Sequence, residues 1–127
     1  MSDGESVRTL ADIDRILGGL SLRDFTTVTS LSFSAVDGQY SKYSLSLIMI
    51  YGPRILRDEL IFQCGGVSNL KIASFGGGLT QIMGLYVKDI SDHGWSELNW
   101  EISDFENGVI SFFAETLSMT LIKHNHA

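Results

Sequence analysis

One segment near the start of the chain repeats its apolar residues at helical spacing. These side chains share one helical face: Leu10, Ile13, Ile16, Leu17 and Leu20. Thr9 is the expected N-cap, and Gly18 with Gly19 supplies a left-handed exit. A helix is therefore predicted over residues 9–20, after a flexible end at residues 1–8. Because so short a helix is unstable alone, we expect it to lie on a sheet.

From residue 24 to residue 122 the apolar period falls toward two, which is typical of β-strands. Polar or glycine-containing turns separate seven such segments: 25–35, 42–51, 59–64, 67–75, 81–90, 95–104 and 109–122. The connections are mostly of hairpin length, and Asn107-Gly108 is a strong hairpin signal. The sequence therefore predicts an α+β fold. One short N-terminal helix packs on a mainly antiparallel sheet of about seven strands, curved or folded into two layers.

The composition supports one packed domain over residues 1–127, with residues 24–122 as its β-rich body and 123–127 as a tail. Of the 127 residues, 44% are hydrophobic, 19% are charged and only one is proline. The first ten residues lack the basic start and apolar core of a secretory signal. The longest apolar run, 47–51, is far shorter than the roughly 20 residues of a membrane span. We expect a cytoplasmic protein without a membrane segment.

The charge balance favours a protein partner over a nucleic acid. Nine Lys and Arg against fifteen Asp and Glu give a formal net charge of −6, which is the wrong sign for neutralising phosphates. Negative charge suits a basic protein partner, because complementary potentials speed encounter and suppress wrong partners. The single cysteine, Cys64, lies in an apolar segment, so we expect it to be buried in a protein of a reducing compartment.

The motifs for catalysis, phosphate binding and metal binding all fail in this sequence. Neither a Lys-Ser/Thr pair nor a predicted helix follows the glycines at 76–78. Residues 104–115 have the length of a calcium loop, but a predicted strand stands where oxygen ligands are needed. His93 beside Asp92 resembles a base dyad, although turn residues of this kind more often bond the backbone. We therefore expect no catalytic residue, metal or cofactor.

The most informative feature is the charge of residues 89–115, which hold seven acids and no Lys or Arg. The period of two places Leu98 and Trp100 toward the core and Trp95 on the acidic side. Aromatic residues inside a charged rim are typical of binding hot spots. A solvated outer sheet face with Trp95 at its edge explains the pattern equally well. The candidate partner-binding residues are Asp89, Asp92, Trp95, Glu97, Glu101, Asp104 and Glu106.

Several short runs in the C-terminal half form a pattern of their own: Leu70-Lys71-Ile72, 75–78, 81–85, Asp89-Ile90-Ser91, Gly94-Trp95 and 104–108. This pattern resembles that of small bacterial proteins of unknown function, and some similar proteins are immunity partners of secreted toxins. The resemblance implies a cytoplasmic, β-rich inhibitor that covers a toxin's active site. It implies no particular site residues.

Two classes of function remain. The leading hypothesis is a non-enzymatic protein-binding module, an immunity-type inhibitor that meets a basic toxin or nuclease domain with its acidic face. The alternative is a small-ligand-binding or enzymatic domain with a pocket between the helix and the curved sheet. That pocket would be lined by Phe33, Tyr43, Met49, Phe62 and Tyr86. A homodimer through an exposed strand edge is compatible with either class.

Overall fold

The computed structural model describes residues 4–36, 38–51, 58–73, 80–82, 84–91, 98–104 and 109–123. Their helices are α1 (Leu10–Leu17) and the short 3-10 helix η1 (Leu22–Asp24). One group of strands is β1 (Glu5–Ser6), β2 (Phe25–Val36), β3 (Gln39–Tyr51), β4 (Glu59–Gly65), β6 (Thr80–Gln81) and β10 (Thr116–Ile122). The other group is β5 (Ser68–Ile72), β7 (Leu85–Asp89), β8 (Trp100–Asp104) and β9 (Ile110–Ala114).

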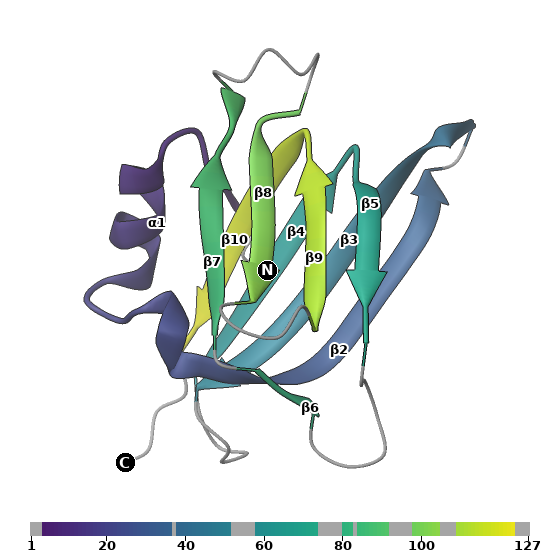
Figure 1. Cartoon of the computed structure of the whole chain (residues 1–127). Coiled ribbons are helices and arrows are strands. Elements are labelled where there is room, and N and C mark those ends of the chain that lie inside the picture. The colour runs from purple at the N-terminus through teal and green to yellow at the C-terminus, as the bar shows by residue number, and fades with distance from the viewer. Residues whose placement is uncertain are drawn as a thin grey trace.

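The strands of the described residues form two antiparallel sheets that lie face to face (Figure 1). The larger sheet has six strands in the order β1-β10-β4-β3-β2-β6, and the smaller has four in the order β5-β9-β8-β7. The α+β class and the antiparallel pairing confirm the prediction. Of the two predicted arrangements the structure has the two-layered one, and the estimate of about seven strands is too low.

The hydrophobic core fills the space between the two sheets. Both layers contribute side chains that are at most 1% exposed, among them Leu47, Met49, Leu60, Ile102 and Phe112. Trp100 of β8 also faces this core, as predicted, and is only 4% exposed. Each such side chain stabilises the fold by roughly 1.5–3 kcal/mol relative to an exposed position, so this layer dominates the stability.

Two predicted strands are each divided between the sheets. The segment 109–122 divides into β9 and β10 at Glu115, where the chain passes from the smaller to the larger sheet. The segment 81–90 divides between β6 and β7 at Gly84, whose φ of 98° is left-handed. A Cβ at Gly84 would lie 2.7 Å from the Cα of Arg23 in η1. Glycine is therefore required there both for its conformation and for its size.

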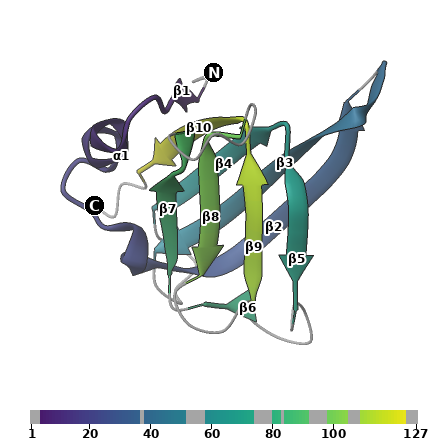
Figure 2. The ribbon, with the colours of Figure 1, turned by 45° about the horizontal axis from the view of Figure 1, so that its top comes forward.

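Helix α1 lies at one side of the two layers, next to β7 and β10 (Figures 1 and 2). Thr9 is its N-cap, and Gly18 ends it with a left-handed φ of 58°, as the sequence predicts. Ile13 and Leu17 are buried and close the core on this side. Among the described residues this is the longest helix, with eight residues, and none could cross a membrane.

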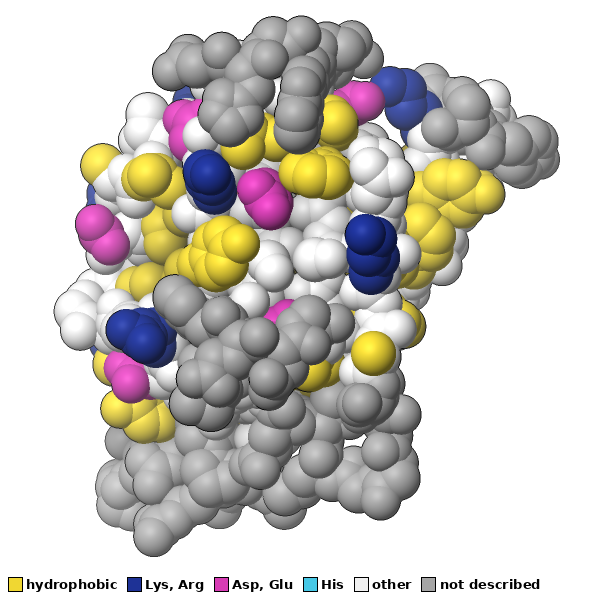
Figure 3. Space-filling view, viewed as in Figure 1, with side chains coloured by type: hydrophobic (Ala, Val, Ile, Leu, Met, Phe, Trp, Pro, Cys, Tyr) yellow, Lys and Arg dark blue, Asp and Glu magenta, His cyan; other side chains and the backbone are white. Residues whose placement is uncertain are grey.

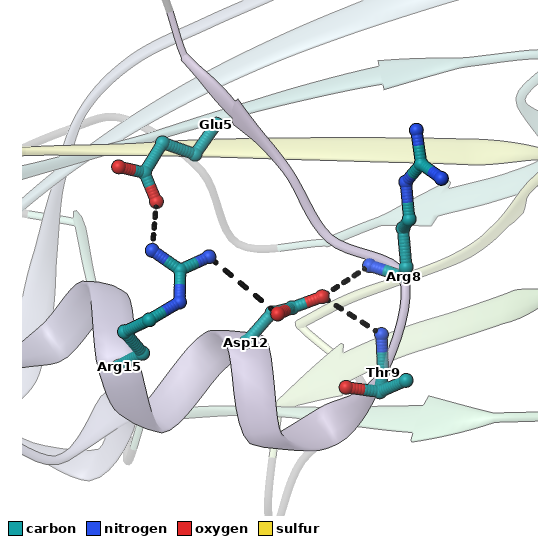
Figure 4. A network of polar contacts seen from close by, with 5 residues as sticks. All are labelled: Glu5, Arg8, Thr9, Asp12 and Arg15. Carbon is teal, nitrogen blue, oxygen red and sulfur yellow. Dashed lines mark hydrogen bonds and ion pairs between the residues drawn. The ribbon is translucent and has the colours of Figure 1, made fainter.

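A network of polar contacts joins the start of α1 to β1 (Figure 4). The Asp12 carboxylate accepts hydrogen bonds from the backbone N–H groups of Arg8 and Thr9, at 2.8 and 3.1 Å. Both bonds hold the pKa of Asp12 below its ordinary value, and the bond from Arg8 has the larger effect. The Arg15 guanidinium donates to Glu5 of β1 at 2.6 Å. Part of the segment expected to be flexible is thus a strand, which pairs with β10.

Candidate functional site

A polar cleft of about 420 Å³ lies where β1 and β10 meet the adjoining ends of β7 and β8. Three charged residues line it: Arg8 after β1, Asp89 at the end of β7, and Glu115 before β10. Ser91 and Asn99 add further polar groups to the wall. The cleft therefore brings together groups from three separate stretches of the chain, within 6–8, 89–100 and 115–118, and its volume is within the range of ligand sites.

Asp89 is exposed at this cleft, and its carboxylate is oriented by the residues that follow it. Its Oδ1 accepts hydrogen bonds from the backbone N–H of Ser91 at 2.9 Å and from the Ser91 hydroxyl at 2.7 Å. Ile90 between them is buried, and its N–H donates to the carbonyl of Asn99 at 2.9 Å. The chain that leaves β7 and the chain that returns before β8 are therefore held side by side at the cleft.

Glu115 is the second acid of the cleft and lies at the junction between the two sheets. Its carboxylate bonds the ammonium group of Lys42, on β3, at 2.7 Å. Its side chain lies over Gly66, where a Cβ would overlap it and where φ is 61°. Asn99 donates its side-chain amide to the Glu115 carbonyl at 2.9 Å. Glycine at position 66 makes room for this acid, while Lys42 and Asn99 hold it in place.

Seven residues are predicted to bind a partner, and the structure describes three of them: Asp89, Glu101 and Asp104. Four lie outside the described residues: Asp92, Trp95, Glu97 and Glu106. Asp89 is the one of the three that lines the cleft.

Glu101 lies on the outer face of the smaller sheet, among residues of both charges. It is directly opposite Lys88 of β7 and next to Phe113 of β9. Lys71 of β5 lies on the same face, opposite Ser111. Figure 3 shows lysine and acidic side chains interspersed there. The described part of this face is therefore mixed in charge, because Lys88 and Lys71 come from sequence positions outside the acidic run.

Asp104 has a structural contact and is only 5% exposed. Its Oδ1 accepts a hydrogen bond from the backbone N–H of Ile110 at 3.0 Å, which ties β8 to β9. The pairing of these two strands is the hairpin that Asn107-Gly108 predicts, although the turn itself lies outside the described residues. A carboxylate buried in this way is not presented to a partner, so we leave Asp104 out of the binding surface.

The residues expected to line a pocket under the helix are not brought together. Met49 and Phe62 are buried in the core, at most 1% exposed. Phe33 and Tyr43 instead stack on the β2–β3 hairpin, with ring centroids 4.8 Å apart. Tyr86 is opposite Ser103, on the outer face of the smaller sheet. The predicted pocket is therefore not formed by these residues.

Cys64 is buried, as predicted, with 4% of its surface exposed. Burial raises the pKa of its thiol to about 12, so the sulfur stays protonated at neutral pH and is a poor nucleophile. Within the described ranges, no group of three or more His, Cys, Asp or Glu side chains is placed to hold a metal ion.

Comparison of the chain with known protein families, with curated proteins and with solved structures finds no match. The resemblance to small bacterial immunity proteins therefore stays a prediction, and the cleft has to be interpreted from its own residues. The acidic run 89–115 includes both Asp89 and Glu115, but it does not indicate the cleft, because the order of the strands brings these two acids together with Arg8.

Proposed function

We propose that the protein is a non-enzymatic protein-binding module that holds a basic partner at the polar cleft. Its most concrete form is an immunity-type inhibitor of a basic toxin or nuclease domain. The observation that carries this proposal is the position of Asp89, whose carboxylate is exposed and oriented by Ser91 at a cleft of about 420 Å³. A carboxylate fixed in this way meets a lysine or arginine at little further cost in ordering.

The overall charge supports the same class of partner. A net charge of −6 attracts a basic protein during its approach, an effect that acts over roughly 8–10 Å at ordinary salt. Asp92 and Glu97 contribute to this net charge, and both lie outside the described residues. Long-range attraction and a local carboxylate act in the same direction.

Arg8 makes the expected partner more specific. It lines the same cleft as Asp89 and Glu115, so the cleft holds both signs of charge. Glu115 is paired with Lys42, and we assign the incoming cation to Asp89 because its side chain is exposed at the cleft and Ser91 holds its carboxylate in position. A partner segment that suits this cleft carries a basic side chain with an acidic or amide group beside it, the latter facing Arg8.

The proposal is tested by charge reversal with a matched control. Asp89→Lys is compared with Asp14→Lys, which makes the same change in net charge at an exposed position of α1. The tagged protein and both variants are used to capture a partner from the source cells, and the affinity of the purified partner is then measured. We expect Asp89→Lys to weaken binding at least about tenfold, or about 1.4 kcal/mol. Asp14→Lys should change it by less than about twofold.

A defined probe makes the test independent of the captured protein. An oligolysine peptide added to isotopically labelled protein should shift the backbone amide signals of Asp89, Ser91 and Asn99 first. Equal binding by the two charge-reversal variants, or peptide-induced shifts that avoid the cleft, would contradict the proposal.

The size of the cleft favours a small polar ligand as the second candidate function. A volume of about 420 Å³ is enough for an amino-acid-sized molecule, and Arg8 and Asp89 offer partners for a carboxylate and an ammonium group. A panel of zwitterionic amino acids, tested by NMR, separates the two functions. Saturable shifts at the cleft that Asp89→Asn abolishes would favour the ligand over the protein partner.

A further inference from the structure

The outer edge of β2 is a long stretch of strand without a described neighbour. β2 has 12 residues, but β6 pairs only with Thr27 and Val28 on this side. No strand of the described residues pairs with 30–36 there. Figures 1 and 2 both show β2 starting on the side of α1 and running to the opposite margin of the molecule, where it joins β3 in a hairpin. Every second residue of such an edge presents its backbone N–H and C=O groups outward.

This edge lacks the features that keep strand edges apart. Residues 30–35 read Ser-Leu-Ser-Phe-Ser-Ala, with no charge, proline or glycine. Exposed edges are usually protected by charged side chains, proline or bulges. The register shifts of β2 fall before Ser30 and after Ala35, so the stretch between them pairs regularly with β3. A regular, neutral edge of this kind is suited to a further strand.

An exposed aromatic pair lies beside the same edge. Phe33 is 40% exposed and stacks on Tyr43, which is 37% exposed. Both lie on the β2–β3 hairpin, which extends beyond the smaller sheet at one corner of the molecule (Figure 1). Aromatic side chains exposed next to unpaired backbone groups gain most when a neighbouring chain covers them.

We propose that a second copy of this chain pairs with this edge, so that two β2 strands run antiparallel about a two-fold axis. In antiparallel pairing, opposite residues point to the same face of the sheet. With Ser32 opposite its own copy, Leu31 faces Phe33 and Ser30 faces Ser34. Apolar residues then meet apolar residues on the inner face, and serines meet serines on the outer face.

Charge also favours a second copy over a basic protein at this edge. Each chain carries a net charge of −6, which opposes self-association in general. Residues 30–35 carry no charge, so their pairing brings no like charges together, and a basic strand would find no acid to meet there. The dimer does not depend on the proposed function. Its edge lies toward one end of the larger sheet, whereas the cleft lies at β1 and β10 toward the other.

The proposal is tested by the oligomeric state of two variants, one with a new charge on the β2 edge and one with the same charge away from it. Ser32, Ser46 and Gln63 form one row across the outer face of the larger sheet. Ser32→Lys puts a charge on the edge, and Gln63→Lys puts it two strands inside. Sedimentation over a range of concentrations should show a dimer for the wild type and for Gln63→Lys. Ser32→Lys should weaken the dimer at least about tenfold, because like charges then face each other.

Cross-linking provides a second measurement that does not depend on stability. Cys64 is buried, so a cysteine introduced on the outer face is the reactive thiol among the described residues. Under mild oxidation, Ser32→Cys should form a covalent dimer much faster than Gln63→Cys.

Three outcomes would overturn the proposal. The wild type could stay monomeric at every concentration, which would leave the edge to a strand of another protein. The two lysine variants could dissociate equally while keeping the wild-type circular dichroism spectrum. The two cysteine variants could cross-link at the same rate.

Discussion

At the scale of single residues, Asp104 shows how a buried position decides the role of an acid. The alternation that turns Trp100 and Ile102 inward also applies to Asp104, two residues further along β8. The negative charge of Asp104 predicts a position on the surface, whereas its place in the period of two indicates burial. The backbone N–H of Ile110 compensates the buried carboxylate. Charge alone is therefore a weaker guide to exposure than charge together with strand period.

Asp104→Ala should destabilise the protein by about 1–3 kcal/mol, because the Ile110 N–H loses its acceptor in a buried place. Asp104→Asn keeps an oxygen acceptor and should lose less. Ser111→Ala, at a partly exposed position on the outer face of the neighbouring β9, serves as the control and should have little effect. Chemical denaturation gives the three values, and a stability unchanged by Asp104→Ala would contradict a structural role for this hydrogen bond.

Cys64 gives a prediction about pH. Burial raises the pKa of the folded thiol from 9.0 to about 12, so the unfolded chain releases this proton first as the pH rises. The stability contributed by the neutral thiol is complete below pH 9 and is lost between about pH 9 and 12, by up to about 1.4 kcal/mol per pH unit. Other groups titrate in this range too, so the comparison is with Cys64→Ala. The difference in unfolding free energy between the wild type and Cys64→Ala should become smaller above pH 9. If the two free energies depend on pH in the same way, the raised pKa of Cys64 is contradicted.

At the scale of elements, the helix is predictable from sequence because its signals are local. Thr9 and Gly18 act within one turn of the residues that they cap, so their roles do not depend on the rest of the fold. The strand junctions depend on which sheet each strand joins. At the junction between β9 and β10, the buried positions switch from even numbers, Ile110 and Phe112, to odd numbers, Leu117 and Met119. No glycine or proline stands between 109 and 122 to mark this change.

A comparison of alanine substitutions at Gly84 and Gly19 tests how much the close contact between η1 and Gly84 contributes to stability. Their φ angles are 98° and 100°, but a Cβ at Gly84 would meet the Arg23 backbone at 2.7 Å, whereas nothing lies within 4 Å at Gly19. Gly19→Ala should cost about 1–2 kcal/mol for its left-handed conformation. Gly84→Ala should cost a further 1–3 kcal/mol or so, because backbone atoms must move. Equal losses on thermal unfolding would show that the approach of η1 to Gly84 carries no energetic weight.

At the scale of the whole molecule, the sequence predicts the class of the fold better than it predicts the site. The period of two in the apolar residues, together with the turn residues, is enough to predict an antiparallel β-rich body. The two-layered arrangement is one of the two forms that this pattern predicts. The cleft depends on strand order, which brings Arg8 near the start of the chain to Glu115 near its end. The charge of its segment is enough to indicate Asp89, whereas Arg8 is a single arginine before a helix and carries no signal of its own.

The two proposed binding surfaces can be occupied at the same time. The β2 edge and the cleft lie toward opposite ends of the larger sheet, so a dimer would leave both of its clefts accessible. A partner with one basic site would then bind in a ratio of one per chain, and a partner with two such sites would gain from the paired arrangement.

The most direct test of the central claim is the association rate of a captured basic partner at low and moderate salt. It is measured for the wild type, Asp89→Lys and Asp14→Lys. The account predicts fast, salt-sensitive association for the wild type, and a slower rate with a flatter salt dependence for Asp89→Lys. Asp14→Lys should remain close to the wild type. Equal rates and equal salt dependence for the two variants would contradict the account, because net charge alone would then explain the binding.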